Sequence, residues 1–379
     1  MIEKVQFRNF KAYRSLDLEL EPFTVLVGPN ASGKTTLLEG LQLLAILFRA
    51  NPRIVADKSI PERYRSAGSK QSPELKYQGR WDGVPVEVNV YGSRTSTPKK
   101  SSVADDVAPY EGAPKVLAEA GSQSSALDVR HAFRQVLRTA VLLRFELRKL
   151  AEPSYSEDQV PGVASDGAGL ASTLAFLKLS REELFENVEA ALRQVVPSVR
   201  RIRIERAPVE QNSVRTIALD GQTTHMAERR TLWGNRIVLD MKGAQNVPAD
   251  SVGEGTLMVL GLLTVLLGPQ KPRLVLLDDI ELSLHPTAQG ELIKTLRAIQ
   301  RDQPGLQIVA TSHSPFILNY LKSEEIRMTF LGEDGFARCE KLTAHPEFEK
   351  WKDLMSPGEF WSTVGENWIG KVPASAPHE

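Results

Sequence analysis

The segment Gly28-Pro-Asn-Ala-Ser-Gly-Lys-Thr35 constrains the fold most, because it matches the pattern G-x-x-x-x-G-K-[ST]. A compact apolar run, Phe23–Val27, precedes it, and apolar residues recur at helical spacing from Leu37 to Phe48 after it. The glycines let the backbone curl so that successive N–H groups converge on phosphate oxygens, and the following helix adds the positive end of its dipole. Strand, loop and helix in this order predict a nucleotide-phosphate site.

Each polar position of this phosphate loop (Gly28–Thr35) has an expected task. Lys34 reaches the β- and γ-phosphates, and the Thr35 hydroxyl ligates Mg²⁺. The remaining nucleotide contacts are expected from Gly28, Asn30, Ser32, Gly33 and Thr36. ATP and Mg²⁺ are therefore the expected cofactors.

A pair of acids follows a second apolar run. Leu274–Leu277 has the composition of a buried strand and ends in Asp278 and Asp279. Ligands of open α/β sheets bind at the carboxyl ends of strands. Asp278 is expected to hold magnesium, and Asp279 to orient or deprotonate an attacking water molecule. Glu281, two residues further on, is a second candidate for the catalytic task.

A histidine follows a third apolar run. Leu306–Ala310 predicts another buried strand, and His313 comes three residues after it. A lone histidine is usually structural. One strand after the paired acids, however, His313 is expected to donate a hydrogen bond to the γ-phosphate and to take part in catalysis.

Together these motifs resemble the ABC-type ATPase heads of the SMC, RecF and OLD group, in particular the compact bacterial branch called AAA-21. The resemblance is carried by Asn9-Phe10, the phosphate loop, Asp166–Leu170, Ser251–Thr256, Asp278-Asp279 with Leu284–Pro286, and Thr311–Pro315. It implies an α/β fold, a P-loop NTPase head with a mixed sheet, an antiparallel β subdomain and an inserted helical and loop segment.

The resemblance also implies a homodimer, or a higher oligomer, that closes around ATP. In this family a signature segment of one subunit meets the γ-phosphate held by the other. Here that segment is Val252–Thr256, with Gly253, Glu254 and Gly255 as the expected nucleotide contacts.

Two positions depart from the family pattern. Gly253 stands where serine is usual, so a hydroxyl is missing unless Ser251 supplies it. Asp279 stands where a catalytic glutamate is usual, and a displacement of about 1 Å can cost on the order of a hundredfold in rate. Slow hydrolysis and ATP held mainly as a dimerisation clamp are both open.

Members of the compact branch are often paired with a separate nuclease or toxin. The resemblance therefore implies a nucleotide-gated switch for a partner effector in bacterial anti-phage defence. No Glu-then-Asp-x-Asp cluster follows His313, so a Toprim-type nuclease domain like that of OLD proteins is not expected. The alternatives are a RecF-like DNA repair or recombination clamp and a non-hydrolysing, ATP-bound scaffold.

Composition limits the remaining classes. Basic and acidic residues both number 47, so a nucleic-acid surface has to be local. The longest apolar stretch, Leu257–Leu267, is about half a membrane span, and the single cysteine, Cys339, excludes an intrachain disulfide. A cytoplasmic protein without membrane contact is expected. DNA contacts or plain solvation are both open for Arg200, Arg201, Arg203, Arg229, Arg230 and Arg236.

Four consecutive segments are expected. They are an N-terminal lobe with the phosphate loop (1–92), an inserted flexible loop and helical segment (93–200), a C-terminal lobe with the signature, the acids and His313 (201–345), and an aromatic tail (346–379). Residues 92–128 lack periodicity and suggest a mobile surface insertion. The tail covers the protein's own core or anchors a partner through Phe348, Trp351, Phe360, Trp361 and Trp368.

Overall fold

The computed structural model describes residues 1–49, 62–81, 84–91, 115–118, 137–219, 222–281 and 283–365. The chain forms two compact units. Unit 1 consists of Met1–Leu142, Pro272–Glu281 and Asp302–Glu379, and unit 2 of Leu143–Lys271 and Leu282–Arg301. Each unit draws on separate stretches of the chain, whereas the four segments expected from the sequence follow one another along it.

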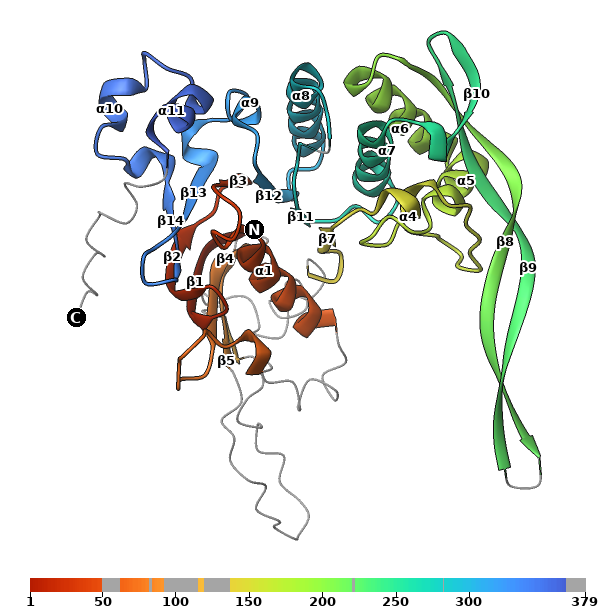
Figure 1. Ribbon diagram of the computed structural model, residues 1–379, viewed down its shortest axis with the longest axis horizontal. Helices are drawn as coiled ribbons and strands as arrows, with labels where there is room; N and C mark the ends of the chain where they lie inside the picture. Colours follow the sequence, from red (N-terminus) through yellow and green to blue (C-terminus); the bar gives the residue numbers. More distant parts are fainter. Residues whose placement is uncertain are drawn as a thin grey trace. The chain divides into compact units, whose positions relative to one another are not determined.

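Unit 1 contains an antiparallel sheet of five strands in the order β2-β1-β4-β5-β6 (Figure 1). Its strands are β1 (Ile2–Phe10), β2 (Tyr13–Glu19), β4 (Glu74–Trp81), β5 (Val84–Tyr91) and β6 (Lys115–Ala118). Alternation of apolar and polar residues buries one face of β1 and β2. Strand β6 corrects the expectation for residues 92–128 at these four positions, because they pair with β5; the rest of that segment lies outside the described residues.

A second sheet of unit 1 has the order β14-β13-β3-β12-β11-β7. Its strands are β3 (Phe23–Val27), β7 (Val141–Leu143), β11 (Leu274–Leu277), β12 (Gln307–Ser312), β13 (Ile326–Leu331) and β14 (Ala337–Lys341). Strands β11, β12, β3 and β13 run parallel, while β14 is antiparallel to β13. The carboxyl ends of β3, β11 and β12 therefore meet at one edge, and the mixed sheet confirms the expected α/β class.

Helix α1 (Lys34–Arg49) packs between the two sheets of unit 1. Gly40 makes this possible, because a side chain there would lie 2.4 Å from the Phe7 ring. The Tyr77 hydroxyl donates a hydrogen bond of 2.6 Å to the Gly40 carbonyl oxygen. These contacts fix the start of α1, and with it the end of the phosphate loop.

Unit 2 combines helices with a long β-ribbon. Its helices are α4 (Leu147–Ala151), α5 (Leu170–Ser180), α6 (Glu182–Val195), α7 (Glu254–Leu267) and α8 (Pro286–Asp302, assigned to unit 2 up to Arg301). Helices α5 and α6 are separated at Arg181, whose φ of −147° is not helical. No described helix is long and apolar enough to cross a membrane, α7 included.

The antiparallel β subdomain consists mainly of two long strands. β8 (Val199–Leu219) and β9 (Gln222–Met241) pair continuously from Arg201 opposite Asp240 to Leu219 opposite Gln222. Pro208 and Gly234 lie within these strands and suggest turns when the sequence is considered alone. Figure 1 shows this ribbon extending well beyond the helices of its own unit, and β10 (Ala244–Pro248) pairs with the base of β9.

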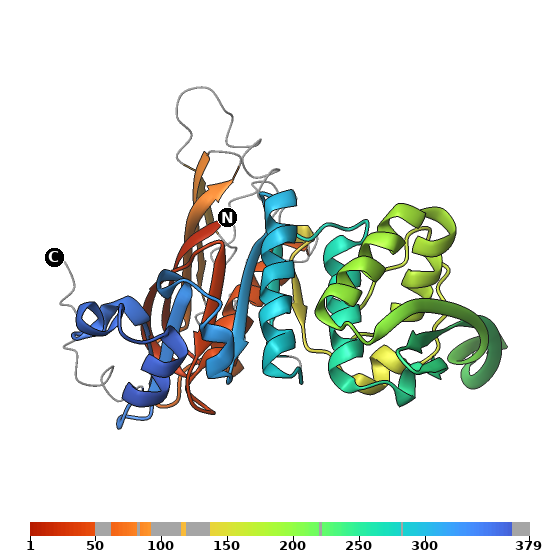
Figure 2. The same cartoon turned by 90° about the horizontal axis from the view of Figure 1, so that it is seen from above.

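The aromatic tail packs on unit 1 (Figure 2, blue). It forms α10 (Phe348–Trp351) and α11 (Pro357–Val364), and α11 contacts α9 (Pro315–Leu318). Phe360 is 3% exposed and meets the rings of His345 and Phe348 edge-on. These contacts favour the interpretation that the tail covers the protein's own core, while Trp368 lies outside the described residues.

Candidate functional site

A pocket of about 320 Å³ lies over the carboxyl ends of β3, β11 and β12 in unit 1. This volume is at the lower end of the range for small-molecule sites. Its lining contains most of the expected site residues together with two alanines: Ala12, Asn30, Ala31, Ser32, Gly33, Lys34, Thr35, Thr36, Asp278, Asp279 and His313. Motifs almost 290 residues apart in the chain thus meet in one cavity.

Two glycines give the phosphate loop its shape. Gly28 has φ +149°, and a side chain there would lie 2.2 Å from the Thr329 carbonyl oxygen. Gly33 has φ +98°, and a side chain there would lie 2.7 Å from the Ala337 side chain. Both the backbone conformation and the close neighbours therefore require glycine at these ends of the loop.

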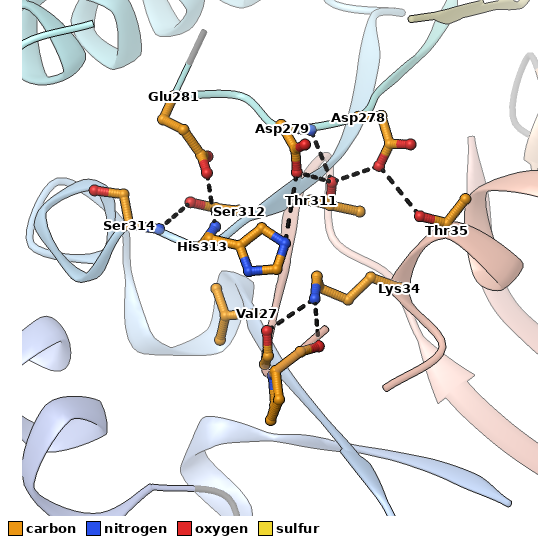
Figure 3. Close-up of polar contacts among 12 residues, drawn as sticks. Val27, Lys34, Thr35, Asp278, Asp279, Glu281, Thr311, Ser312, His313 and Ser314 are labelled. Atoms are coloured by element: carbon orange, nitrogen blue, oxygen red, sulfur yellow. Dashed lines mark hydrogen bonds and ion pairs between the residues drawn. The ribbon is translucent and has the colours of Figure 1, made fainter. Parts of the chain in front are cut away.

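Lys34 is buried, and its ammonium group lies inside the curve of the loop. Its Nζ atom donates to the carbonyl oxygens of Gly28 at 2.8 Å and Pro29 at 2.7 Å (Figure 3). A cation held at the centre of converging loop groups suits a polyphosphate. The fit to ATP thus rests on this ammonium group and on the N–H groups at the start of α1.

Thr35 and Asp278 face each other across the pocket. The Thr35 Oγ1 atom lies 3.5 Å from Asp278 Oδ1. A hydroxyl and a carboxylate are hard oxygen donors of the kind that Mg²⁺ takes together with water and phosphate oxygens. These two residues fit the expected magnesium ion, which would neutralise charge on the phosphate oxygens.

The hydroxyl of Thr311 organises both aspartates. It donates to Asp278 Oδ1 at 2.8 Å and accepts from the Asp279 backbone N–H at 2.8 Å. Thr311 is fully buried near the end of β12. The sequence alone assigns Thr311 no task, although its place one strand over from the acids is a usable signal.

Asp279 and His313 lie together at the rim of the pocket. The His313 Nε2 atom is 3.8 Å from Asp279 Oδ1, and the two side chains are 39% and 61% exposed. Burial raises the pKa of Asp279 above its ordinary value, and the nearby carboxylates of Glu281 and Asp278 raise it further. A carboxylate with a raised pKa can accept a proton from water. The imidazole beside it can donate a hydrogen bond to a phosphate.

Glu281 contacts the backbone of the histidine rather than the pocket. Its Oε1 atom accepts the His313 backbone N–H at 2.9 Å, and its Oε2 atom is buried without a hydrogen bond among the described residues (Figure 3). Glu281 does not line the pocket. The observed contact fixes the segment that carries His313, and a direct catalytic task for Glu281 stays a prediction.

The signature segment belongs to unit 2. Gly253 precedes the first turn of α7 and is exposed, and a side chain added there would meet nothing within 4 Å. Glu254 is exposed and Gly255 is buried. The Ser251 hydroxyl donates to Asp250 Oδ1 at 3.2 Å, so it is engaged locally. The contacts of Gly253, Glu254 and Gly255 with nucleotide stay a prediction.

Residues 113–319, more than half of the chain, match the family described as "AAA domain, putative AbiEii toxin, Type IV TA system". The chain belongs to this AAA domain family. Residues 1–73 of the AAA domain chain also match an "AAA ATPase domain".

Curated relatives of the AAA domain chain align with parts of it. The DNA replication and repair protein RecF of Chloroflexus aurantiacus is 33% identical over 133 residues, 35% of this chain and 32% of the relative. The OLD nuclease of Thermus scotoductus is 43% identical over 44 residues, 12% of this chain and 8% of the relative. The chain thus spans about a third or less of the curated relatives that it matches.

Solved structures resemble the AAA domain chain over most of its length. A Smc head bound to the C-winged helix domain of ScpA has a TM-score of 0.54 at 14% identity, covering 89% of this chain and 96% of the other. A Smc head with an extended coiled coil, bound to the C-terminal domain of ScpA from Pyrococcus furiosus, has a TM-score of 0.51 at 14% identity, covering 93% and 99%. The fold is that of an SMC-type head, and family and relatives together identify an ATPase head of the SMC, RecF and OLD group.

Proposed function

We propose that this chain binds Mg²⁺-ATP in the pocket of unit 1 and hydrolyses it. The supporting observation is the convergence of Lys34, Thr35, Asp278, Asp279 and His313 on one cavity. Membership of an AAA domain family supports nucleotide binding. The ammonium group and the loop N–H groups match the phosphates, and the Thr35–Asp278 pair matches the magnesium ion.

Residues at the rim of the pocket carry out the hydrolytic step in this proposal. Asp279 accepts a proton from the attacking water, and its raised pKa suits it to that task. His313 donates a hydrogen bond to the γ-phosphate, and Glu281 holds the His313 backbone in place. Because Asp279 is shorter than the usual glutamate, we expect slow turnover.

Two copies of the chain close around the nucleotide in this proposal. The signature segment of one copy supplies Gly253, Glu254 and Gly255 at the start of α7 to the γ-phosphate held by the other. The exposed start of a helix offers N–H groups and the positive end of the helix dipole. The open space around Gly253 supports the approach of a second molecule.

The ATP-dependent dimer acts as a switch for a separate effector in bacterial defence. The family description, which names a toxin and a Type IV toxin–antitoxin system, supports this setting. A cytoplasmic location belongs to the same proposal. The effector in this proposal is a nuclease or toxin encoded by another gene. The chain should be co-expressed with the products of neighbouring genes, and the effector should co-purify with it only when ATP is present.

Sedimentation velocity with and without ATP tests the core of the proposal. The wild-type chain should dimerise with ATP and Mg²⁺, and Asp279→Asn should hold the dimer longer because hydrolysis is blocked. Lys34→Ala should lose ATP binding and dimerisation, whereas the exposed Lys294→Ala should retain both. ATP binding by Lys34→Ala at wild-type affinity would contradict the proposal.

A RecF-like DNA clamp is the second candidate, favoured by the 33% identity to RecF. Three ribbon arginines are paired with acids across the strands: Arg203 with Asp240, Arg236 with Glu205, and Arg229 with Glu210. This pairing lowers the charge available for phosphates. Salt-sensitive binding of duplex DNA that is lost in Arg201→Glu/Arg203→Glu would support the clamp.

A non-hydrolysing scaffold is the remaining candidate. Asp279 supports it, because the carboxylate is one methylene shorter than the usual glutamate. Absence of turnover in the wild type, with turnover gained in Asp279→Glu, would favour the scaffold over the enzyme.

A further inference from the structure

Strand β13 contacts the phosphate loop through Thr329. Its pairing with β3 ends at Met328 opposite Val27, so Thr329 comes directly beside the first residue of the loop. Thr329 Oγ1 donates to the Val27 carbonyl oxygen at 3.0 Å and lies 2.5 Å from Ser32 Oγ. One side chain thus joins both ends of the curve between Val27 and Ser32.

Each hydroxyl has a single proton to donate, and this fixes the direction of the two hydrogen bonds that Thr329 makes. The single proton of Thr329 is donated to Val27, so Ser32 has to donate its own proton to Thr329. Ser32 is 1% exposed and Thr329 is fully buried. The Ser32 hydroxyl therefore has no proton left for a phosphate oxygen, and its side chain acts on the shape of the loop.

Close packing adds to the hydrogen bonds. The Thr329 carbonyl oxygen occupies the space where a side chain on Gly28 would lie, 2.2 Å from that position. The loop therefore rests against Thr329 at its first glycine and bonds to it at its fifth residue. No shift of this stretch is possible without breaking a buried contact.

We infer that Thr329 is a positioning residue that fixes the curvature of the phosphate loop, and that Ser32 serves nucleotide binding through it. The inference rests on the proposed nucleotide site. A loop whose N–H groups are already aimed at one point has less conformational freedom to lose when phosphate binds. The loss of the hydroxyl pair should therefore weaken ATP binding by about tenfold, which corresponds to roughly 1.4 kcal/mol.

The test compares Thr329→Val, which removes the hydroxyl at nearly constant volume, with Thr329→Ser, which keeps it. The matched control is Thr24→Val, because Thr24 is a fully buried threonine of β3 whose hydroxyl bonds only to the backbone of Glu21 among the contacts described. The dissociation constant of a fluorescent ATP analogue should rise about tenfold in Thr329→Val and change less than about twofold in Thr329→Ser and Thr24→Val.

Two further measurements separate this inference from its parent proposal. Amide hydrogen exchange of residues 28–34, measured without nucleotide, should accelerate in Thr329→Val and not in Thr24→Val. Hydrogen exchange tests the loop even if the wild type binds no ATP. Absence of ATP binding by the wild type would overturn only the nucleotide proposal. Ser32→Ala removes the same bond from the loop side, so Ser32→Ala/Thr329→Val should lose no more affinity than either single variant.

Unchanged loop exchange and unchanged affinity in both Thr329→Val and Ser32→Ala would overturn the inference. An equal rise in exchange in Thr24→Val would do the same, because the effect would then belong to the sheet as a whole.

Discussion

The residue after Asp278, the proposed magnesium ligand, has an uncommon backbone conformation. Asp279 has φ +57°, in the left-handed region that Asp and Asn enter several times more often than most residues. Its N–H is held there by the Thr311 hydroxyl. The backbone at position 279 thus gives a physical reason for the shorter acid, and a glutamate introduced there adds reach together with backbone strain.

Thr311→Val tests how far the two aspartates depend on one hydroxyl. The variant keeps the volume but removes the partner of both Asp278 Oδ1 and the Asp279 N–H. We expect turnover to fall roughly 10- to 100-fold through misplacement of the acids, with ATP affinity changed less than threefold. Phosphate release and nucleotide titration measure the two effects.

The control for Thr311→Val is Thr295→Val in α8, a buried threonine whose hydroxyl donates to the Glu291 carbonyl oxygen. It should leave turnover unchanged. Wild-type turnover in Thr311→Val would show that the acids hold their positions without the threonine.

Among the elements, helix α7 begins without a side-chain cap. Gly253 occupies the N-cap position and has no side chain that could accept a hydrogen bond from the first turn. Serine is a better cap than glycine by a few tenths of a kcal/mol. The same substitution supplies the hydroxyl that the resemblance to ABC-type heads leads us to expect here, so one change probes both the helix and the proposed dimer.

Gly253→Ser should be tolerated, because the added side chain meets no neighbour within 4 Å. We expect a stability gain of a few tenths of a kcal/mol and ATP-dependent dimerisation tighter by about three- to tenfold, since a new hydrogen bond reaches the γ-phosphate. Thermal denaturation and sedimentation measure these effects. Gly253→Ala fills the same space without a hydroxyl and should not tighten the dimer; equal tightening in both variants argues against direct contact.

His345 lies just before the tail helices and packs against Phe360 of α11, and we expect it to make this packing dependent on pH. Burial lowers the pKa of His345 below its ordinary value of 6.5, although the Glu347 carboxylate opposes this shift. The folded protein therefore binds this proton less readily than the unfolded chain. The contribution to stability is complete above pH 6.5 and is lost as the pH falls through that value toward the folded pKa.

Thermal denaturation between pH 8 and pH 5 checks the effect of His345. His345→Asn keeps an acceptor for the Glu347 N–H, which now bonds to the His345 Nδ1 atom at 3.0 Å, and removes the titration. The variant should lose less stability than the wild type on acidification. Parallel pH profiles for both proteins would assign the acid sensitivity to other groups.

Elements marked by local signals could be predicted from the sequence, and those set by distant contacts could not. The motifs of four site residues predict strand ends from the sequence alone. The structure places these residues at such ends: Lys34, Thr35, Asp278 and His313. The directions of Thr311, Glu281 and Thr329 depend on neighbouring strands that local sequence does not specify. The length of the ribbon could not be predicted, because Pro208 and Gly234 interrupt the sequence pattern of its strands while cross-strand pairing continues through them.

For the whole molecule, the two compact units divide the candidate site residues between them. The phosphate loop, the acids and His313 belong to unit 1, while the signature segment belongs to unit 2. Each unit is built from stretches far apart in the chain, and the short segment Pro272–Glu281 is the part of unit 1 that carries the acids. Ligand binding in unit 1 should therefore stabilise contacts among three separate stretches of chain.

Nucleotide and magnesium should raise the melting temperature together. At a free ATP concentration of about 100 times the dissociation constant, the expected stabilisation is about 2.7 kcal/mol. Removal of Mg²⁺ with EDTA should reduce it, because Thr35 and Asp278 lose their common ion. Differential scanning calorimetry measures the shift. Lys34→Ala should show none, and an equal shift in that variant would place ATP elsewhere.

The length of the ribbon has a mechanical consequence. Strands of 21 and 20 residues extend about 65 Å at roughly 3.3 Å per residue. A rotation of about 10° at the base would therefore carry the far end of the strands through about 11 Å, given that length. Helices α5 and α6 contact the base of the ribbon, whereas the displacement at the far end would be comparable to the width of a helix. The length of the ribbon would thus convert a small rotation at its base into a large displacement of its far end, in the unit that carries the signature segment.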